Sequence, residues 1–260
     1  MSTENLNIAI VQPDSIWLDA EKNRLKINAL LKGLSVHPDL ILLPEMFSTG
    51  FCTDPAPVAE PMDGPTVQWM KKTAEDMHCA IAGSLIVSNH DKFYNRLVFV
   101  DRHGMEWYDK RHLFCIEGEE ADYTAGTKPL IINLGLWRIN FLICYDLRFP
   151  VWSRNRQNYD LLVYSSSWPA GRSDVWNTLL RARAMENQSY VAGINRVGKD
   201  GNGIDYIGES VLIDPKGKEI ATLAPSEEGV INAAISLNEI NNFRTKFPVW
   251  KDADGFSINQ

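Results

Sequence analysis

The sequence predicts a single α/β domain over residues 1–260. Short apolar runs, typical of buried strands, alternate along the chain with longer amphipathic stretches, and this alternation indicates the α/β class. A chain of 260 residues can bury one large core, and a composition of 45% hydrophobic and 23% charged residues is typical of a globular enzyme. Because no linker or low-complexity segment divides the chain, one domain is expected.

The first half of the chain predicts two helices between strands. The run 6–11 is a short apolar strand, and 18–34 is an amphipathic helix because its apolar residues recur near helical spacing. The continuous apolar run 40–43 predicts a strand that is buried on both faces. The elements that follow are a helix over 64–77, strands over 80–87, 95–100 and 105–110, and a long irregular segment over 111–126, whose length points to function.

The second half repeats the alternation. The predicted elements are a hairpin of strands 130–134 and 137–143, a helix over 149–156, a strand over 161–165, a helix from Ser173 or Asp174 to 187, a strand over 190–195, a glycine-rich turn over 198–203, a strand and turn over 211–217, and a last strand over 229–235. Residues 243–260 carry aromatic side chains without periodicity. We expect them to dock as a tail on the body or on a partner subunit.

Charge and composition exclude several kinds of protein. The net charge of −7 and pI of about 5.3 argue against nucleic acid and anionic membranes as main partners. No apolar run approaches a membrane span, and residues 1–5 lack the features of a signal peptide, so a cytoplasmic protein is expected. The four cysteines (Cys52, Cys79, Cys115 and Cys144) and the five histidines show neither disulfide nor zinc-ligand spacing, so no metal is expected.

The stretch FLICYDLRFP, residues 141–150, is the most informative one. A predicted strand ends at Cys144, and a polar turn and a possible helix start follow it. Reactive groups of α/β folds lie at such strand ends, and a helix N-terminus favours the thiolate over the thiol. The alternative is that Cys144 is one more buried structural cysteine.

Two more strand ends carry groups that complement this thiol. Glu45 follows the strand 40–43, and Lys110 ends another strand. A thiolate can attack a carbonyl carbon, a carboxylate can act as general base, and an ammonium together with the backbone N–H of Tyr145 can stabilise the oxyanion. Burial would raise the pKa of Glu45 and the lysine would lower it, and the sequence leaves this balance open. In isolation, Glu45 could equally cap a loop or pair with a surface lysine.

The stretches LLPEMF, YDKRHLF and ICYDLRFP, in this order, resemble the motifs of the carbon–nitrogen hydrolase (nitrilase) superfamily. The resemblance runs from Gln12 to about Trp250 and includes RARAMENQSYVAGINRVG, which is similar to the helix–strand unit after the nucleophile. It implies that Glu45 is the base, Lys110 the lysine and Cys144 the nucleophile. It also implies a four-layer α-β-β-α sandwich, a homodimer or higher homo-oligomer, and no metal or organic cofactor.

The family also uses a second glutamate in the loop after the lysine. The spacing Glu-x-x-x-Tyr before Thr124 places this residue at Glu119, with the neighbouring Glu120 left as an alternative. Within the superfamily, ICYDLRFPVWSRN and NRVGKDGNG look most like the ω-amidases, including the bacterial 2-oxoglutaramate amidases. This resemblance implies hydrolysis of the terminal amide of a short 2-oxo-dicarboxylic monoamide to the acid and ammonia, through a thioester.

Such a substrate also carries a free carboxylate. Arg172, in the loop after Trp168, is the candidate to bind it, because a guanidinium can hold a carboxylate through two hydrogen bonds. Phe51 and Trp168 are candidates to line the pocket. The alternatives are a solvated Arg172 and a Trp168 that only packs in the core, whereas Arg148 is expected to pair structurally with a nearby Asp or Glu.

Three other functions remain open on the sequence. A cysteine–histidine hydrolase would need a histidine near Cys144, and His112 is the one in a suggestive loop. The same three catalytic residues could instead act on a carbamoyl amino acid, an aliphatic amide or a nitrile. A non-catalytic scaffold is the third possibility, which the presence of all three catalytic residue types argues against.

Overall fold

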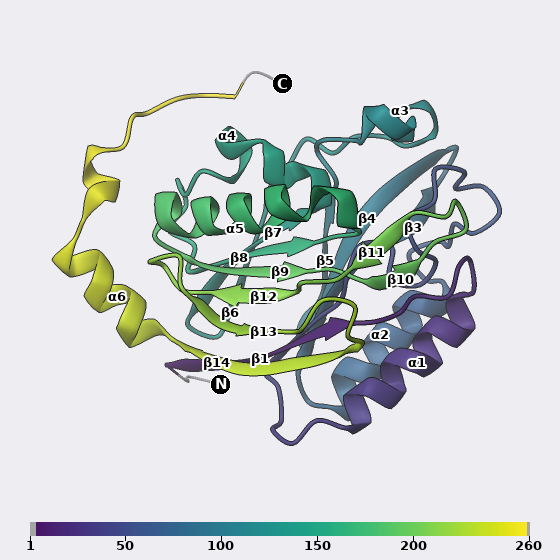
Figure 1. Cartoon of the computed structure of the whole chain (residues 1–260), viewed down its shortest axis with the longest axis horizontal. Coiled ribbons are helices and arrows are strands. Elements are labelled where there is room, and N and C mark those ends of the chain that lie inside the picture. Colours follow the sequence, from purple (N-terminus) through teal and green to yellow (C-terminus); the bar gives the residue numbers. More distant parts are fainter. Residues whose placement is uncertain (1–3, 259–260) are drawn as a thin grey trace.

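Two six-stranded sheets lie face to face in the computed structural model, which describes residues 4–258 (Figure 1). The first sheet has the order β14-β1-β2-β3-β4-β5. Its strands β1, β2 and β3 are parallel, and its other pairs are antiparallel. The bounds of its strands are β1 Asn5–Gln12, β2 Leu40–Leu42, β3 Ala80–Asn89, β4 Lys92–Asp101, β5 Gly104–Asp109 and β14 Gly229–Ser236.

The second sheet has the order β13-β12-β9-β8-β7-β6 and the same design. Strands β7, β8 and β9 are parallel at its centre, and antiparallel strands flank them. The bounds of its strands are β6 Leu130–Leu134, β7 Trp137–Ile143, β8 Leu161–Ser165, β9 Tyr190–Ile194, β12 Val211–Ile213 and β13 Glu219–Thr222. Both centres are therefore parallel and apolar, as expected for strands that are covered on both faces.

Helices cover the outer face of each sheet, so the fold has four layers (Figure 1). Helices α1 (Ala20–Lys32) and α2 (Pro65–Asp76) pack on the first sheet, and α5 (Ser173–Asn187) packs on the second. Between the sheets, the rings of Phe99 and Phe141 meet with centroids 5.7 Å apart. Gly193 faces α5, and a Cβ atom there would lie 2.5 Å from Leu180 Cδ1, so the close approach of this helix depends on glycine. The expected α-β-β-α sandwich is confirmed.

Short elements complete the described chain. A two-stranded sheet joins β10 (Val197–Lys199) to β11 (Asp205–Ile207), and α3 (Glu119–Asp122) lies in the segment that was expected to be irregular. The 3₁₀ helices are η1 Cys115–Glu117, η2 Cys144–Arg148, η3 Ala170–Arg172 and η4 Val249–Asp252. Within residues 4–258, no helix combines the length and apolar character that crossing a membrane requires.

The structure differs from the predicted elements at several points. The helix over 149–156 is only the turn α4 (Pro150–Ser153), because Asn155 leaves the helical path to bind Asn187 at the end of α5. Strand β13 was missed. The segment that was predicted to be an aperiodic tail begins inside helix α6 (Leu237–Lys246), which the sequence signalled through Ser236 and Glu239, the spacing of an N-terminal capping box. Residues 259–260 of this tail lie outside the described residues.

The core between the sheets should carry much of the stability. Phe141→Ala is expected to lower the free energy of unfolding by about 3–5 kcal/mol, because Phe141 is fully buried and its removal leaves a cavity. Phe247→Ala, the same change at a side chain that is 58% exposed, should cost less than about 1 kcal/mol. Urea unfolding of both variants measures the difference, and equal losses would contradict a core at this position.

Candidate active site

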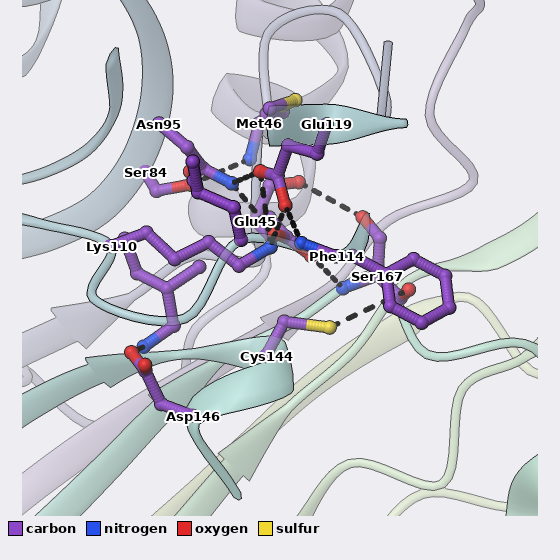
Figure 2. Close-up of polar contacts among 12 residues, drawn as sticks. Glu45, Met46, Ser84, Asn95, Lys110, Phe114, Glu119, Cys144, Asp146 and Ser167 are labelled. Atoms are coloured by element: carbon purple, nitrogen blue, oxygen red, sulfur yellow. Dashed lines mark hydrogen bonds and ion pairs between the residues drawn. The ribbon is translucent and has the colours of Figure 1, made fainter. Parts of the chain in front are cut away.

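The site lies where strand ends from both sheets converge (Figure 2). Glu45 follows β2, Lys110 directly follows β5, and Cys144 directly follows β7. The two sheets meet here because the Glu45 N–H donates to the Ser166 carbonyl at 3.3 Å, just after β8. All these strands present their C-terminal ends, the edge at which open α/β sheets place ligands.

Lys110 is held between two carboxylates. Its Nζ lies 2.8 Å from Glu45 Oε1 and 2.8 Å from Glu119 Oε2. All three side chains are buried, whereas Glu120 is exposed, so Glu119 is the glutamate that joins this cluster. An ammonium already occupies the space between the carboxylates, and within residues 4–258 no group of three His, Cys, Asp or Glu side chains could hold a metal ion.

The Glu45 carboxylate accepts hydrogen bonds on both oxygens. Oε1 accepts from Asn95 Nδ2 at 2.7 Å as well as from Lys110, and Oε2 accepts from the Ser167 N–H at 2.9 Å. Asn95 also donates to Glu119 Oε1 at 3.0 Å, and its own oxygen accepts from Ser84 Oγ at 2.9 Å. The orientation of Glu45 is therefore set by three different segments of the chain.

The sequence reasoning missed Asn95, Ser84 and Ser167. Asn95 is a fully buried amide within β4, but Arg96 and other polar residues in the same strand left it without a distinct sequence signal. Ser167 ends a run of three serines after β8, at the strand edge where ligand groups gather. Ser84 gave no signal of its own.

Backbone strain marks the two segments that carry the reactive groups. Cys144 has φ 41°, and Met46, the residue after Glu45, has φ 45°. Side chains other than glycine rarely adopt this left-handed conformation, and such strain clusters at functional sites. The half-buried Cys144 thiol points toward the Ser167 carbonyl, with Sγ and O 3.8 Å apart (Figure 2).

The environment raises the pKa of all three groups. Burial raises the pKa of Glu45 and the negative charge of Glu119 adds to this, so burial outweighs the opposing effect of Lys110. Burial alone would lower the pKa of Lys110, but Glu119 and Glu45 outweigh it and raise that pKa. Burial and the charge of Glu45 raise the pKa of Cys144 well above its usual range. Burial and Glu45 therefore outweigh the helix N-terminus, which favours the thiolate, and the resting group is a thiol that needs a base.

A cavity opens beside the thiol and brings the predicted residues together. Its lining includes Phe51, Tyr145, Trp168 and Arg172, as expected from the sequence, and also Phe114, Glu117, Arg148, Ser167, Pro169 and Tyr206, which were not predicted to line it. Tyr145 is the second residue of the 3₁₀ helix η2. The first backbone N–H groups of a helix have no acceptor inside that helix, so the Tyr145 N–H can donate to a ligand. The walls combine five aromatic side chains with five charged ones.

Two guanidinium groups in this lining form cation–π contacts with aromatic side chains. Arg148 lies over Trp168 at 5.2 Å, and Arg172 lies over Phe114 at 5.1 Å. Neither forms an ion pair with a carboxylate of residues 4–258, so the expected pairing of Arg148 with an Asp or Glu was wrong. Glu117, which also lines the cavity, interacts with the charge of Arg172 without forming an ion pair, so both guanidinium groups keep donors for an anionic ligand.

His112 does not reach the thiol. Its Nδ1 lies 2.7 Å from Asp146 Oδ1, and its ring stacks on Phe149 with centroids 3.8 Å apart. The ring is thus committed to a structural role, and it is absent from the lining of the cavity. This geometry argues against the cysteine–histidine alternative.

Several known proteins are similar to this chain in sequence and in fold. The sequence profile of the carbon–nitrogen hydrolase family matches residues 7–245. The chain is 43% identical to the omega-amidase YafV of Escherichia coli K12 over 97% of this chain and 98% of that protein, and 34% identical to the 2-oxoglutaramate amidase of Bacillus subtilis over 94% and 96%. A CN-hydrolase superfamily protein from Xanthomonas campestris, whose crystal structure has an arsenic adduct in the active site, superposes with a TM-score of 0.95 at 39% identity and covers 98% of this chain and 99% of its own. The chain belongs to the carbon–nitrogen hydrolase family.

Proposed function

We propose that this protein hydrolyses the terminal amide of a short 2-oxo-dicarboxylic acid monoamide, such as 2-oxoglutaramate, to the acid and ammonia. The observation that carries the proposal is one cavity that contains the Cys144 thiol, the Lys110–Glu45 pair and two arginines without carboxylate partners. The similarity to an omega-amidase and to a 2-oxoglutaramate amidase supports the same substrate class.

The first half of the reaction forms a thioester. As the Cys144 sulfur attacks the amide carbon, its proton passes to Glu45, whose raised pKa makes it a stronger base than an ordinary glutamate. The negative charge that develops on the carbonyl oxygen is stabilised by the Lys110 ammonium and the Tyr145 N–H. The C–N bond then breaks, and ammonia leaves with the proton that Glu45 had taken.

The second half releases the acid. Glu45 takes a proton from a water molecule, the hydroxide attacks the thioester carbon, and the broken C–S bond returns the sulfur to the thiol with that proton. Glu119 does not take part in proton transfer in this scheme. It positions Lys110 through two bonds of 2.8 and 3.1 Å and keeps the ammonium charged.

The carboxylate of the substrate would bind to the guanidinium groups. Arg172 is the main candidate and Arg148 a second one, because a guanidinium binds a carboxylate through two parallel hydrogen bonds. Phe51 and Trp168 would pack against the short carbon chain. A neutral amide lacks the anionic group and would lose this anchor.

We also propose that the chain is a single cytoplasmic domain that forms a homodimer or higher homo-oligomer. All four cysteines are free thiols, which suits a reducing compartment. The C-terminal segment contacts the body, since Gln188 Nε2 donates to the Phe247 carbonyl at 2.7 Å and Arg156 lies over Phe256. The exposed side chains of Phe247 and Trp250 support burial against a second copy.

Ammonia release from a panel of compounds tests the function directly. The panel contains 2-oxoglutaramate, succinamate, an aliphatic amide, a carbamoyl amino acid and a nitrile. We expect fast release from 2-oxoglutaramate and none with Cys144→Ala. Activity confined to another compound would keep the catalytic residues and overturn the substrate class, and silence across the panel with no adduct on Cys144 would favour a non-catalytic scaffold.

The activity should rise with pH through the pKa of Glu45. Glu45 accepts a proton only when it is ionised, and its pKa is raised, so kcat/KM should fall on the acid side at a pH above the ordinary glutamate range. Lys110 should cause no loss on the alkaline side, because its pKa is raised as well. Glu45→Gln should lower kcat by about 10²–10⁴-fold, whereas the exposed control Glu120→Gln should keep the wild-type profile. Wild-type turnover by Glu45→Gln would contradict the role as base.

Arg172→Met should weaken binding of the charged substrate selectively. Losing hydrogen bonds to a charged group costs about 1.5–3 kcal/mol, so KM for 2-oxoglutaramate should rise about 10–100-fold. KM for the neutral aliphatic amide should stay the same, as should both values in the exposed control Arg138→Met. Steady-state kinetics with both compounds measures this, and an equal rise for the two amides would show that Arg172 does not recognise a carboxylate.

A further inference from the structure

Asp146, two residues after the nucleophile, is the acceptor for a cluster of buried donors. Its Oδ2 accepts from the Tyr108 hydroxyl at 2.7 Å and from the Ile143 N–H at 3.0 Å. Its Oδ1 accepts from the His112 N–H at 3.0 Å and lies 2.7 Å from His112 Nδ1. The side chain is fully buried and does not line the cavity, so it does not touch a substrate there.

The partners of Asp146 flank the two reactive groups. Tyr108 lies two residues before Lys110 and His112 two residues after it, on the segment from the first sheet. Ile143 directly precedes Cys144, on the segment from the second sheet. One carboxylate therefore joins the lysine segment to the cysteine segment across the two sheets.

The partners are themselves held in place. The Tyr108 oxygen accepts from Trp152 Nε1 at 3.0 Å and from the Arg111 N–H at 3.1 Å, so its hydroxyl hydrogen is left for Asp146. Burial raises the pKa of Tyr108, and the neighbouring Asp146 raises it further, which keeps the hydroxyl protonated. The His112 ring is packed between Phe149, on which it stacks, and the edge of Trp152.

We propose that Asp146 is a positioning residue that fixes the Lys110 ammonium relative to the Cys144 sulfur. This inference rests on the proposed acyl-transfer chemistry. In that chemistry the sulfur must reach the carbonyl carbon while the Lys110 ammonium donates to the oxygen of the same carbonyl group. An asparagine cannot replace Asp146, because donors approach both of its oxygens and an amide offers only one acceptor oxygen. The loss should therefore appear in reactions that form an oxyanion and not in the intrinsic reactivity of the thiol.

Two probes of Cys144 separate these effects without using an ω-amide substrate. Acylation by p-nitrophenyl acetate forms an S–C bond, passes the thiol proton to Glu45 and expels p-nitrophenolate through an oxyanion. Alkylation at the CH2 carbon of iodoacetamide also forms an S–C bond and passes the thiol proton to Glu45, but it expels iodide with no oxyanion. Mass spectrometry of the Cys144 peptide measures both rates, and the exposed Cys115 serves as an internal reference.

In Asp146→Asn we expect acylation to fall about 100-fold, because small misplacements of reacting groups have effects of this size. Alkylation of Cys144 should change less than about threefold, since thiol reactivity follows thiolate character. Tyr108→Phe removes the hydroxyl that donates to Asp146 and accepts from Trp152 Nε1 and the Arg111 N–H, and it should show a smaller loss of the same kind. Asp160→Asn, a matched change at a buried aspartate that binds Arg244 at the other end of β8, should leave both rates as in the wild type.

A parallel fall of acylation and alkylation in both Asp146→Asn and Tyr108→Phe would overturn the proposal, as would unchanged acylation. The readout does not use an ω-amide. A failed substrate panel would therefore reject the proposed function and leave this test standing.

Discussion

The ammonium of Lys110 between Glu45 and Glu119 is the interaction on which the site depends. A charged lysine that is fully buried is stable only where opposite charge and hydrogen bonds compensate the loss of water, and two carboxylates supply both. The same carboxylates would repel each other without the lysine. The burial of each charged group therefore depends on the other two.

This unit also sets the chemistry. With one ammonium for two carboxylates, the buried cluster carries excess negative charge when all three groups are ionised, which makes it favourable for Glu45 to take up a proton. Burial first, and then the negative charge of Glu45, raise the pKa of the Cys144 thiol beside it and keep it protonated. Proton transfer from sulfur to carboxylate thus removes a charge from the buried cluster at the moment when the carbonyl oxygen begins to gain one.

The proposed catalytic residues could be predicted from the sequence because they sit at strand ends inside short motifs. Glu45 and Cys144 follow apolar strands at the parallel centres of the two sheets, whereas Lys110 follows the antiparallel edge strand β5. Asn95 and Ser84 could not be placed in the same way, because their role depends on which strands are neighbours and in what register. The protonation of the thiol could not be predicted from the local sequence for a similar reason. The helix end that favours the thiolate is outweighed by burial and by Glu45, which is distant in the sequence. Helix α6 was missed although its signal is local. Ser236 and Glu239 have the spacing of a capping box, but the residues that follow show no periodic apolar face.

The pairing of β1 with β14 has a consequence for how the chain folds. Gln12 pairs with Gly229, so β1 waits for a partner strand that the ribosome makes much later. Closing so long a loop adds little to the entropy cost, which grows only with the logarithm of loop length, but contacts this distant in sequence slow folding. Until then, one edge of β1 presents unpaired backbone groups on an apolar strand, which is a template for aggregation. Expression conditions that slow aggregation during synthesis should therefore affect the yield of this protein more than conditions that stabilise its finished fold.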